Sequence, residues 1–349
     1  MPMPKRLTAA SIVGVALVAT LVQPATALPR GTEVKAYKRG LDFAVDMAWV
    51  PGTRKIFFTQ KGGAVKILIG RRLLQRPCVR LPVDSSGERG ALGIALHPRY
   101  KKNHRLYVYY TNASPLENRV ARFVVRNNRC TRQRLVVRGI GSGSVHNGGQ
   151  LEFMKGKLFV TVGENGNAAR SQDPADRVGK ILRYNPRGTI PDGNPFANAV
   201  WARGLRNPFG ITHKPGTGKL FVSDNGPSCD DELNRIRKGA NYGWGSGYSC
   251  GTNGVGIEPK GPVWRWNPVI APTDLGWYVG RLKALSGTMY MGDYLNGRLY
   301  RFIMNRRDNR PTKVRTIYDH PGAILSVSKG PGRWLYLVSP GAINRIVRS

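Results

Sequence analysis

Acidic residues are scarce in this chain: 20 Asp and Glu stand against 55 Lys and Arg, which gives a net charge of +35. Long apolar runs are rarer still, because only the N-terminus carries one, and this excludes a protein with several membrane-spanning helices. Hydrophobic residues nevertheless make up 41% of the sequence. That share excludes a disordered basic tail, and 349 residues suffice to bury a large core in one domain or two.

The single apolar run has the features of an export signal. Met1–Arg6 is short and basic, Leu7–Val22 is apolar, and Ala25-Thr26-Ala27 has the small-x-small pattern of a signal-peptidase site. At about 16 residues the run is shorter than the ~20 that a membrane span needs, although a retained N-terminal anchor is the alternative. The sequence therefore predicts a signal peptide over residues 1–27, cleavage near Ala27, and a secreted, periplasmic or cell-envelope protein over residues 28–349.

Cysteine is also rare, with four residues and no CxxC pair: Cys78, Cys130, Cys229 and Cys250. The missing pair argues against a zinc or dithiol redox motif. In an oxidising compartment two disulfides are expected, and four cysteines allow three pairings. We favour Cys229–Cys250 as the local loop, which leaves Cys78–Cys130 as the second bond.

Amphipathic helices of the kind that a Rossmann fold needs are absent, and one strand pattern recurs six times instead. Each unit has an apolar strand, a gap and a second strand with a basic residue, and in several units another strand precedes them. The apolar strands align, about 46–69 residues apart, on Ile56, Leu106, Leu158, Leu220, Met289 and Leu335. The basic residues are Lys66, Arg122, Arg183, Arg235, Arg301 and Arg345. The pattern predicts an all-β fold, a six-bladed β-propeller of four-stranded antiparallel blades, whose functional sites lie near the central channel.

One of the five histidines is a candidate for chemistry. His146 opens the inner strand of a blade, and the two glycines that follow it, Gly148 and Gly149, allow a ligand to approach the backbone closely. Imidazole takes up a proton near neutral pH, as a general base must. Glu164 ends the adjacent strand, where its carboxylate would hold the imidazole in one tautomer. The alternative is an ordinary turn histidine, and we interpret the other four histidines as structural or solvated.

Four of the 20 acids fall within residues 224–232, on a predicted loop. Oxygen-rich loops of this kind suit Ca²⁺, which takes six to eight oxygen ligands including backbone carbonyls. The spacing is not that of an EF-hand, and an acidic turn paired with neighbouring arginines is the alternative. A third candidate is Arg206-Asn207, which also opens an inner strand and should face the same end of the channel as His146. Arginine offers a fork of donors to a carboxylate or phosphate, whereas the alternative role is a structural salt bridge.

The positive charge is spread over all the predicted blades, without a zinc finger or an RNA-binding aromatic signature, and this argues against a specific nucleic-acid site. Non-specific attraction to anionic polymers or surfaces is expected at low salt.

Several segments, in order along nearly the whole mature chain, resemble the quinoprotein glucose/sorbosone dehydrogenase family, the soluble aldose sugar dehydrogenases. They are Gly87-Glu88-Arg89-Gly90-Ala91-Leu92-Gly93, His146-Asn147-Gly148-Gly149, Gly179-Lys180-Ile181-Leu182-Arg183, Gly188-Thr189-Ile190-Pro191, Asn194-Pro195-Phe196, Arg206-Asn207-Pro208, Asp231-Glu232-Leu233-Asn234 and Asn241-Tyr242-Gly243-Trp244.

The resemblance implies a six-bladed propeller that binds pyrroloquinoline quinone (PQQ) with Ca²⁺ over the channel and oxidises the anomeric hydroxyl of aldoses by hydride transfer to PQQ. It implies that His146 is the base, and that Glu164 orients it where the family usually has an aspartate. It also implies cofactor contacts and, through backbone carbonyls, Ca²⁺ ligands. The implied cofactor contacts are Arg206, Asn207, Asn225 and Thr273, and the implied Ca²⁺ ligands are Gly226 and Pro227.

Two segments depart from the family pattern. Enzymatic relatives usually carry basic residues before the last hairpin, matched to the cofactor's carboxylates, whereas Pro321–Val327 has none. Asp274 also stands in a turn that is usually uncharged. An alternative function is therefore a non-catalytic secreted propeller that binds an anionic polysaccharide or a protein through its basic surface. The sequence does not indicate which sugar or which electron acceptor an enzyme of this kind would use.

Overall fold

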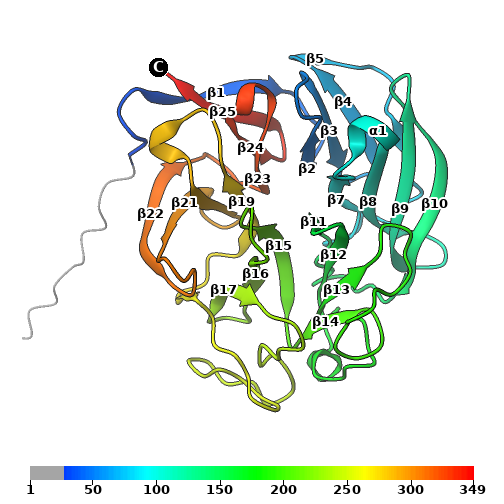
Figure 1. Ribbon diagram of the computed structural model, residues 1–349, viewed down its shortest axis with the longest axis vertical. Helices are drawn as coiled ribbons and strands as arrows, with labels where there is room; N and C mark the ends of the chain where they lie inside the picture. The colour runs from blue at the N-terminus through cyan, green and yellow to red at the C-terminus, as the bar shows by residue number, and fades with distance from the viewer. Residues whose placement is uncertain (1–26) are drawn as a thin grey trace, which may run out of the picture.

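The computed structural model describes residues 27–349, which form a ring of six antiparallel β-sheets (Figure 1). Each sheet contains four strands in a row, and the first also carries a fifth short strand. One edge strand of every sheet lies next to the centre of the ring, where it contacts the equivalent strands of both neighbours. The prediction of an all-β, six-bladed propeller with four-stranded blades is confirmed.

The strands follow the chain blade by blade, from the centre of the ring outward. The first blade comprises β2 (Ala44–Trp49), β3 (Lys55–Gln60), β4 (Ala64–Ile69) and β5 (Arg72–Leu73), with β6 (Val79–Arg80) also paired to β4. The second comprises β7 (Ala91–Leu96), β8 (Arg105–Asn112), β9 (Glu117–Arg126) and β10 (Arg129–Ile140). The third comprises β11 (Leu151–Met154), β12 (Lys157–Val162), β13 (Lys180–Tyr184) and β14 (Val200–Arg203).

The remaining three blades have the same order, except that the last one borrows the first strand of the described chain. The fourth comprises β15 (Asn207–His213), β16 (Leu220–Asn225), β17 (Asp231–Ile236) and β18 (Trp264–Trp266). The fifth comprises β19 (Pro272–Tyr278), β20 (Thr288–Asp293), β21 (Arg298–Met304) and β22 (Pro311–Asp319). The sixth comprises β23 (Ser326–Lys329), β24 (Leu335–Ser339), β25 (Ala342–Arg348) and, outermost, β1 (Thr32–Arg39).

Helices are few and short in residues 27–349. They are α1 (Tyr100–Asn103) and the 3₁₀ turns η1 (Ala168–Ser171), η2 (Lys283–Leu285) and η3 (Pro331–Arg333). A helix with the length and apolar character of a membrane span is not found among these residues. The predicted signal peptide lies, up to Thr26, outside the described residues.

The six-fold repeat has a structural basis in one cross-strand pair. The apolar strands of the repeat are the second strands of the blades, and the basic residues lie on the third strands. In five blades the basic residue is directly opposite an aromatic residue on the second strand. These pairs are Tyr107↔Arg122, Phe159↔Arg183, Phe221↔Arg235, Tyr290↔Arg301 and Tyr336↔Arg345.

The first blade departs from this register, so placing Lys66 in the equivalent position was wrong by one residue. Ile67, not Lys66, is opposite the equivalent aromatic residue, Phe57. Because successive strand residues point to opposite faces, Lys66 turns to the other side of its sheet, and its ammonium donates to the Gln75 carbonyl at 2.7 Å.

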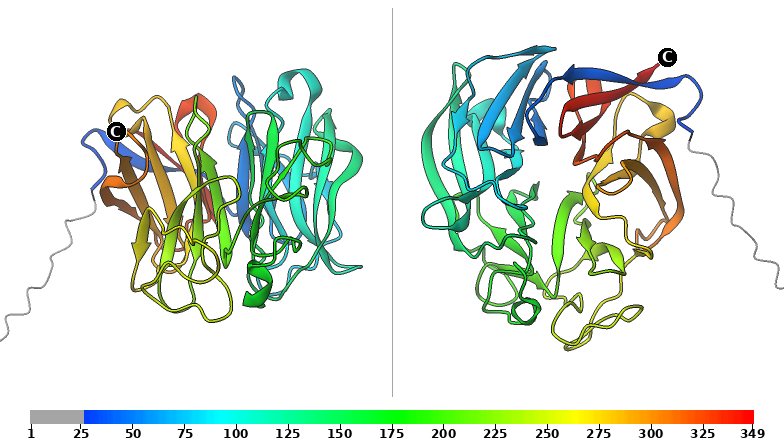
Figure 2. Two further views of the ribbon diagram at one scale, coloured as in Figure 1. Left: turned by 60° about the horizontal axis from the view of Figure 1, so that its bottom comes forward. Right: turned by 180° about the vertical axis from the view of Figure 1, so that it is seen from behind.

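The cores lie between the blades, and each pair of neighbours shares one buried apolar cluster. Closure of the ring depends on β1, which pairs antiparallel with β25 and so joins the two ends of the described chain (Figure 2). The two predicted disulfides are both present. Cys78–Cys130 connects the first two blades, and Cys229–Cys250 closes a loop within the fourth.

Two buried carboxyl groups meet at the centre of the ring. The Ser326 hydroxyl lies 2.7 Å from Asp46 Oδ1 and 3.0 Å from Asp274 Oδ2, and so links the inner strands of three blades. Burial raises the pKa of Asp46 to about 6. Burial and the charge of Asp46 raise the pKa of Asp274 well above its usual range. One hydroxyl proton cannot satisfy two carboxylates, so this contact favours a protonated carboxyl.

These carboxyl groups predict a stability that falls as pH rises. Acids whose pKa is raised in the folded state bind more protons there than in the unfolded chain, so stability is full below pH ~4 and is lost as pH rises through the folded pKa. For Asp46 the loss should fall between pH ~4 and about 6. Asp274→Asn should flatten the urea-unfolding free energy between pH 4 and pH 8 and add about 1 kcal/mol at pH 8. Asp192→Asn, at an exposed position, is the control. Parallel pH profiles for wild type and Asp274→Asn would contradict this account.

Candidate functional site

The candidate residues come from three blades, yet antiparallel pairing brings them to one end of the ring. The start of an innermost strand and the end of the second strand lie at the same end, because these strands run in opposite directions. His146 and Arg206 precede the innermost strands β11 and β15, and Glu164 follows the second strand β12. We call this end of the ring the mouth. The candidate site at the mouth comprises His146, Glu164, Arg206, Asn207, Asn225, Gly226, Pro227 and Thr273.

His146 and Glu164 are in direct contact. His146 Nδ1 lies 2.5 Å from Glu164 Oε1. The Glu164 side chain is buried, and its Oε2 has no hydrogen-bond partner among the described residues. No residue within 27–349 hydrogen-bonds to the other ring nitrogen of His146, Nε2. With Nδ1 protonated toward the carboxylate, Nε2 carries a lone pair at the mouth and is able to accept a proton.

The backbone around His146 is held in an uncommon conformation. Its φ is 54°, in the left-handed region that costs a non-glycine residue roughly 1 kcal/mol. Glu88 offsets this cost, because its Oε2 accepts the His146 N–H at 2.6 Å while its own N–H donates to the Ser144 carbonyl at 2.8 Å. A Cβ at Gly163 would lie 2.0 Å from the His146 carbonyl oxygen, so only glycine allows the two loops to approach this closely.

Arg206 and Asn207 connect the histidine loop to the next blade. The Arg206 guanidinium donates to the Gly226 carbonyl at 2.6 Å and to the Asn225 carbonyl at 3.1 Å. Asn207 Oδ1 accepts the Gly148 N–H at 3.2 Å, so its side chain supports the turn that follows His146. The prediction that these residues face the same end of the channel as His146 is confirmed.

The acids of residues 224–232 are engaged by the protein itself. Asp224 accepts the N–H groups of Arg206 and Asn207 at 3.1 and 2.7 Å. Burial and nearby Glu232 raise the pKa of Asp224 to about 8. Arg265 lies 3.5 Å from both Asp230 and Glu232. The alternative of an acidic turn paired with arginine thus describes these side chains, and the backbone carbonyls remain the candidate cation ligands.

Asn225 and Thr273 bridge blades at the mouth. The Asn225 amide donates to the carbonyls of Asn207 and Pro272, both at 3.1 Å. The Thr273 hydroxyl is buried and donates to the Ile324 carbonyl at 2.5 Å. These bonds fix the relative positions of the fourth, fifth and sixth blades, and contact of either residue with a cofactor stays a prediction.

Sequence reasoning did not assign roles to Glu88 and Lys180. The Lys180 ammonium is buried and donates to the carbonyls of Arg170, Ser171 and Val178. These bonds anchor the loop that joins β12 to β13. Burial lowers the pKa of Lys180 to about 7. Both residues lie in segments that carry the family resemblance, which was the available signal, but their partners are distant in sequence.

Two aromatic residues beside the site were also not assigned. Trp244 lies against Arg206, with the guanidinium carbon 5.3 Å from the ring centroid. Tyr248 packs on Trp244, with centroids 5.0 Å apart. The indole Nε1 of Trp244 has no hydrogen-bond partner among residues 27–349. The hollow between these rings and Gly226 is about 10 Å³, roughly the space of one water.

The chain is similar in sequence to sugar dehydrogenases. Residues 41–348 match the Glucose / Sorbosone dehydrogenase family. The aldose sugar dehydrogenase YliI of Escherichia coli K12 is 27% identical over 357 aligned residues, which cover 92% of this chain and 94% of that protein. Quinoprotein glucose dehydrogenase B of Acinetobacter calcoaceticus is 33% identical over 195 residues, which cover 46% of this chain and 41% of that protein.

A solved structure agrees with the sequence comparison. The PQQ-bound aldose sugar dehydrogenase of Streptomyces coelicolor superimposes with a TM-score of 0.80 at 28% identity, over 92% of this chain and 99% of that one. This chain therefore belongs to the glucose/sorbosone dehydrogenase family, which points to an oxidoreductase of the glucose dehydrogenase type.

Proposed function

We propose that this protein is an exported, PQQ- and Ca²⁺-dependent dehydrogenase that oxidises the anomeric hydroxyl of aldoses. The observation that supports this proposal best is the His146–Glu164 contact of 2.5 Å at the mouth, with Nε2 unoccupied by any described residue. Export is proposed from the N-terminal segment together with the two disulfides, which are typical of oxidising compartments.

The residues at the mouth fit such a cofactor in two respects. The carbonyls of Gly226 and Pro227 are hard oxygen donors, which Ca²⁺ prefers. The Gly226 carbonyl already accepts from Arg206, so a cation would use its second lone pair. Arg206 adds a fixed positive charge beside them, suited to an anionic oxygen of a quinone.

In this proposal His146 does the proton chemistry. Its Nε2 accepts the proton of the anomeric hydroxyl as the anomeric C–H leaves as hydride and a carbonyl forms at that carbon. Glu164 keeps Nδ1 protonated and stabilises the imidazolium that results. PQQ, when bound, supplies the electrophilic centre that takes the hydride, and Ca²⁺ supplies Lewis-acid polarisation.

The segment Pro321–Val327 makes this chain unusual among such enzymes. It carries no basic residue, and Ile324 and Leu325 are buried apolar side chains. The negative charge of a bound PQQ would therefore be balanced mainly by Arg206 and Ca²⁺. We expect cofactor binding to depend steeply on Ca²⁺ for this reason.

Substitution of His146 and of Glu164 tests the proposed activity. With saturating PQQ, Ca²⁺ and a panel of aldoses, wild-type protein should reduce a dye, and His146→Ala should lower kcat at least about 100-fold, since a general base contributes 10²–10⁴. Glu164→Gln should lower kcat by less and shift the pH profile, because the imidazolium loses its counter-charge. His104→Asn, in the turn at the opposite end of the second blade, is the matched control.

Two results would contradict the proposal. The first is an absence of PQQ-dependent turnover by wild-type protein with every aldose. The second is turnover that survives in His146→Ala at the rate of the control.

A second candidate function rests on the outer face of the second blade. The hairpin of β9 and β10 presents exposed arginines, none of which forms an ion pair with a described acid, and no acid occurs between Glu117 and Glu152. These arginines are Arg126, Arg129, Arg132, Arg134 and Arg138. Guanidinium groups match carboxylates well, so the favoured ligand is a carboxylated polysaccharide that holds the protein to its surroundings.

This second function predicts salt-dependent retention. Wild-type protein should bind immobilised polygalacturonate at about 20 mM salt and be released as salt rises, because the contacts are screened. A variant with Arg129, Arg132 and Arg134 changed to Gln should elute at lower salt, while neutral dextran should retain neither protein. Equal elution of wild type and variant would exclude the hairpin as the binding face. Stronger retention on double-stranded DNA would favour a nucleic acid instead.

A further inference from the structure

The turn between β16 and β17 makes several contacts beyond the strand pairing of its own blade. It runs from Gly226 to Asp230 and carries the two carbonyls proposed as Ca²⁺ ligands. The β16–β17 ladder extends up to the pair Asp224↔Glu232, close to both ends of this turn. The additional contacts come mainly from the long irregular segment 237–263, which joins β17 to β18.

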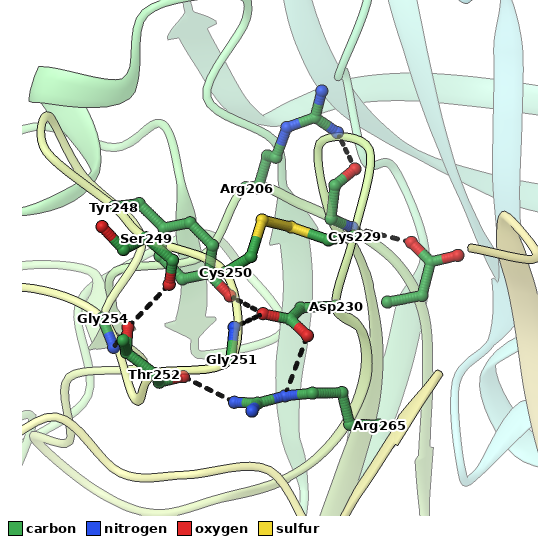
Figure 3. Close-up of a disulfide and its surroundings, with 12 residues drawn as sticks. Arg206, Cys229, Asp230, Tyr248, Ser249, Cys250, Gly251, Thr252, Gly254 and Arg265 are labelled. Carbon is green, nitrogen blue, oxygen red and sulfur yellow. Dashed lines mark hydrogen bonds and ion pairs between the residues drawn. A yellow bond between two sulfur atoms is a disulfide. The ribbon is translucent and has the colours of Figure 1, made fainter. Parts of the chain in front are cut away.

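The first contact is covalent. Cys229, in the turn, forms a disulfide with Cys250, in the irregular segment, across 21 residues of sequence (Figure 3). Cys229 is 5% exposed whereas Cys250 is exposed, so the bond runs from the buried turn to the surface of the molecule. A disulfide at this place restricts how far the turn can move away from the segment.

The second contact is polar and involves the neighbouring residue. Asp230 is 3% exposed and has a left-handed backbone, with φ 56°. Its Oδ2 accepts the Tyr248 hydroxyl at 2.9 Å and also the Gly251 N–H, while its Oδ1 faces Arg265 at 3.5 Å (Figure 3). The strained backbone conformation is thus held by side-chain bonds to residues on both sides of Cys250.

The Gly226 carbonyl is coupled directly to these contacts. A Cβ at Gly226 would lie 1.9 Å from the Cys229 carbonyl oxygen, so the two backbones touch. The Gly226 N–H donates to Asp231 Oδ1 at 2.8 Å, and its carbonyl accepts from Arg206 at 2.6 Å. Because these atoms are close-packed, a displacement of Cys229 would disturb the backbone at Gly226.

The same segment also supports Arg206 from its other side. Tyr248 packs on Trp244, and Trp244 packs on the Arg206 guanidinium. One loop therefore contacts both the proposed cation ligands and the proposed cofactor arginine.

We infer that the Cys229–Cys250 disulfide and Asp230 are positioning elements for the cation site, a role that rests on the proposed function. They hold in place the turn that carries the Gly226 and Pro227 carbonyls. Cation ligands that are held in place bind more tightly than ligands that must first be ordered. Loss of the disulfide should therefore weaken Ca²⁺ binding beyond what a general loss of stability would cause.

The second disulfide provides a matched control for this inference. Cys78–Cys130 connects the first and second blades, and neither cysteine contacts the candidate site. The double variants Cys229→Ser/Cys250→Ser and Cys78→Ser/Cys130→Ser should both unfold at lower urea concentration than wild type. Ca²⁺ titration by calorimetry, with PQQ present, should give a Kd at least tenfold weaker for the first variant and changed less than twofold for the second.

A milder variant keeps the test informative if the first double variant does not fold. Tyr248→Phe removes only the hydroxyl that bonds Asp230 and retains the ring that packs on Trp244. It should weaken Ca²⁺ binding two- to threefold with little change in unfolding. An unchanged Kd in this variant and in Cys229→Ser/Cys250→Ser would overturn the inference while leaving the proposed function intact. Absence of Ca²⁺ binding by wild type would overturn both.

Discussion

The whole site depends on closure of the ring by β1. This strand comes first in the described chain and pairs with β25, the last, so the sixth blade is completed by residues from both ends. Closure forces the six innermost strands around one axis, and their equivalent ends then converge. His146, Arg206 and Thr273 lie far apart in sequence, yet all three belong to the same end of the ring because each lies near the start of an innermost strand.

Burial of acidic side chains adds to the excess of positive charge on the surface. Nine of the 20 acids are buried, and all but Glu164, which contacts His146, accept backbone N–H groups or pair with lysine or arginine side chains. Those nine are Asp46, Glu164, Asp224, Asp230, Asp231, Glu232, Asp274, Asp293 and Asp308. Few acids remain to neutralise the outside, so the exposed surface is more positive than the composition alone suggests.

The ring and the Cys229–Cys250 disulfide could be predicted from sequence because they rest on local patterns, and Cys78–Cys130 followed as the remaining pair. Alternation of apolar residues and the recurrence of a basic residue are properties of single hairpins, and Cys229–Cys250 is a short loop. The contact between His146 and Glu164 was also foreseeable, since the two residues flank adjacent strands of one blade.

The remaining features depend on contacts between residues far apart in sequence and on strand register, which a local sequence pattern does not reveal. Ser326 bonds Asp46 across 280 residues of sequence, and only closure of the ring brings them together. The one-residue shift of Lys66 is a matter of register, which similar apolar strands leave undetermined. Glu88 supports His146 from another part of the ring, and its role appears only when the backbone geometry of both loops is known.

The central claim is that the mouth of the ring binds PQQ with Ca²⁺, and an absorbance titration tests it most directly. PQQ should be titrated with purified protein in the presence of Ca²⁺, then treated with a chelator, with Arg206→Ala measured in parallel. The account predicts a saturable spectral change at one PQQ per chain, its reversal by the chelator, and weaker binding by the variant. A PQQ spectrum that does not change with wild-type protein, or that changes equally with Arg206→Ala, would contradict it.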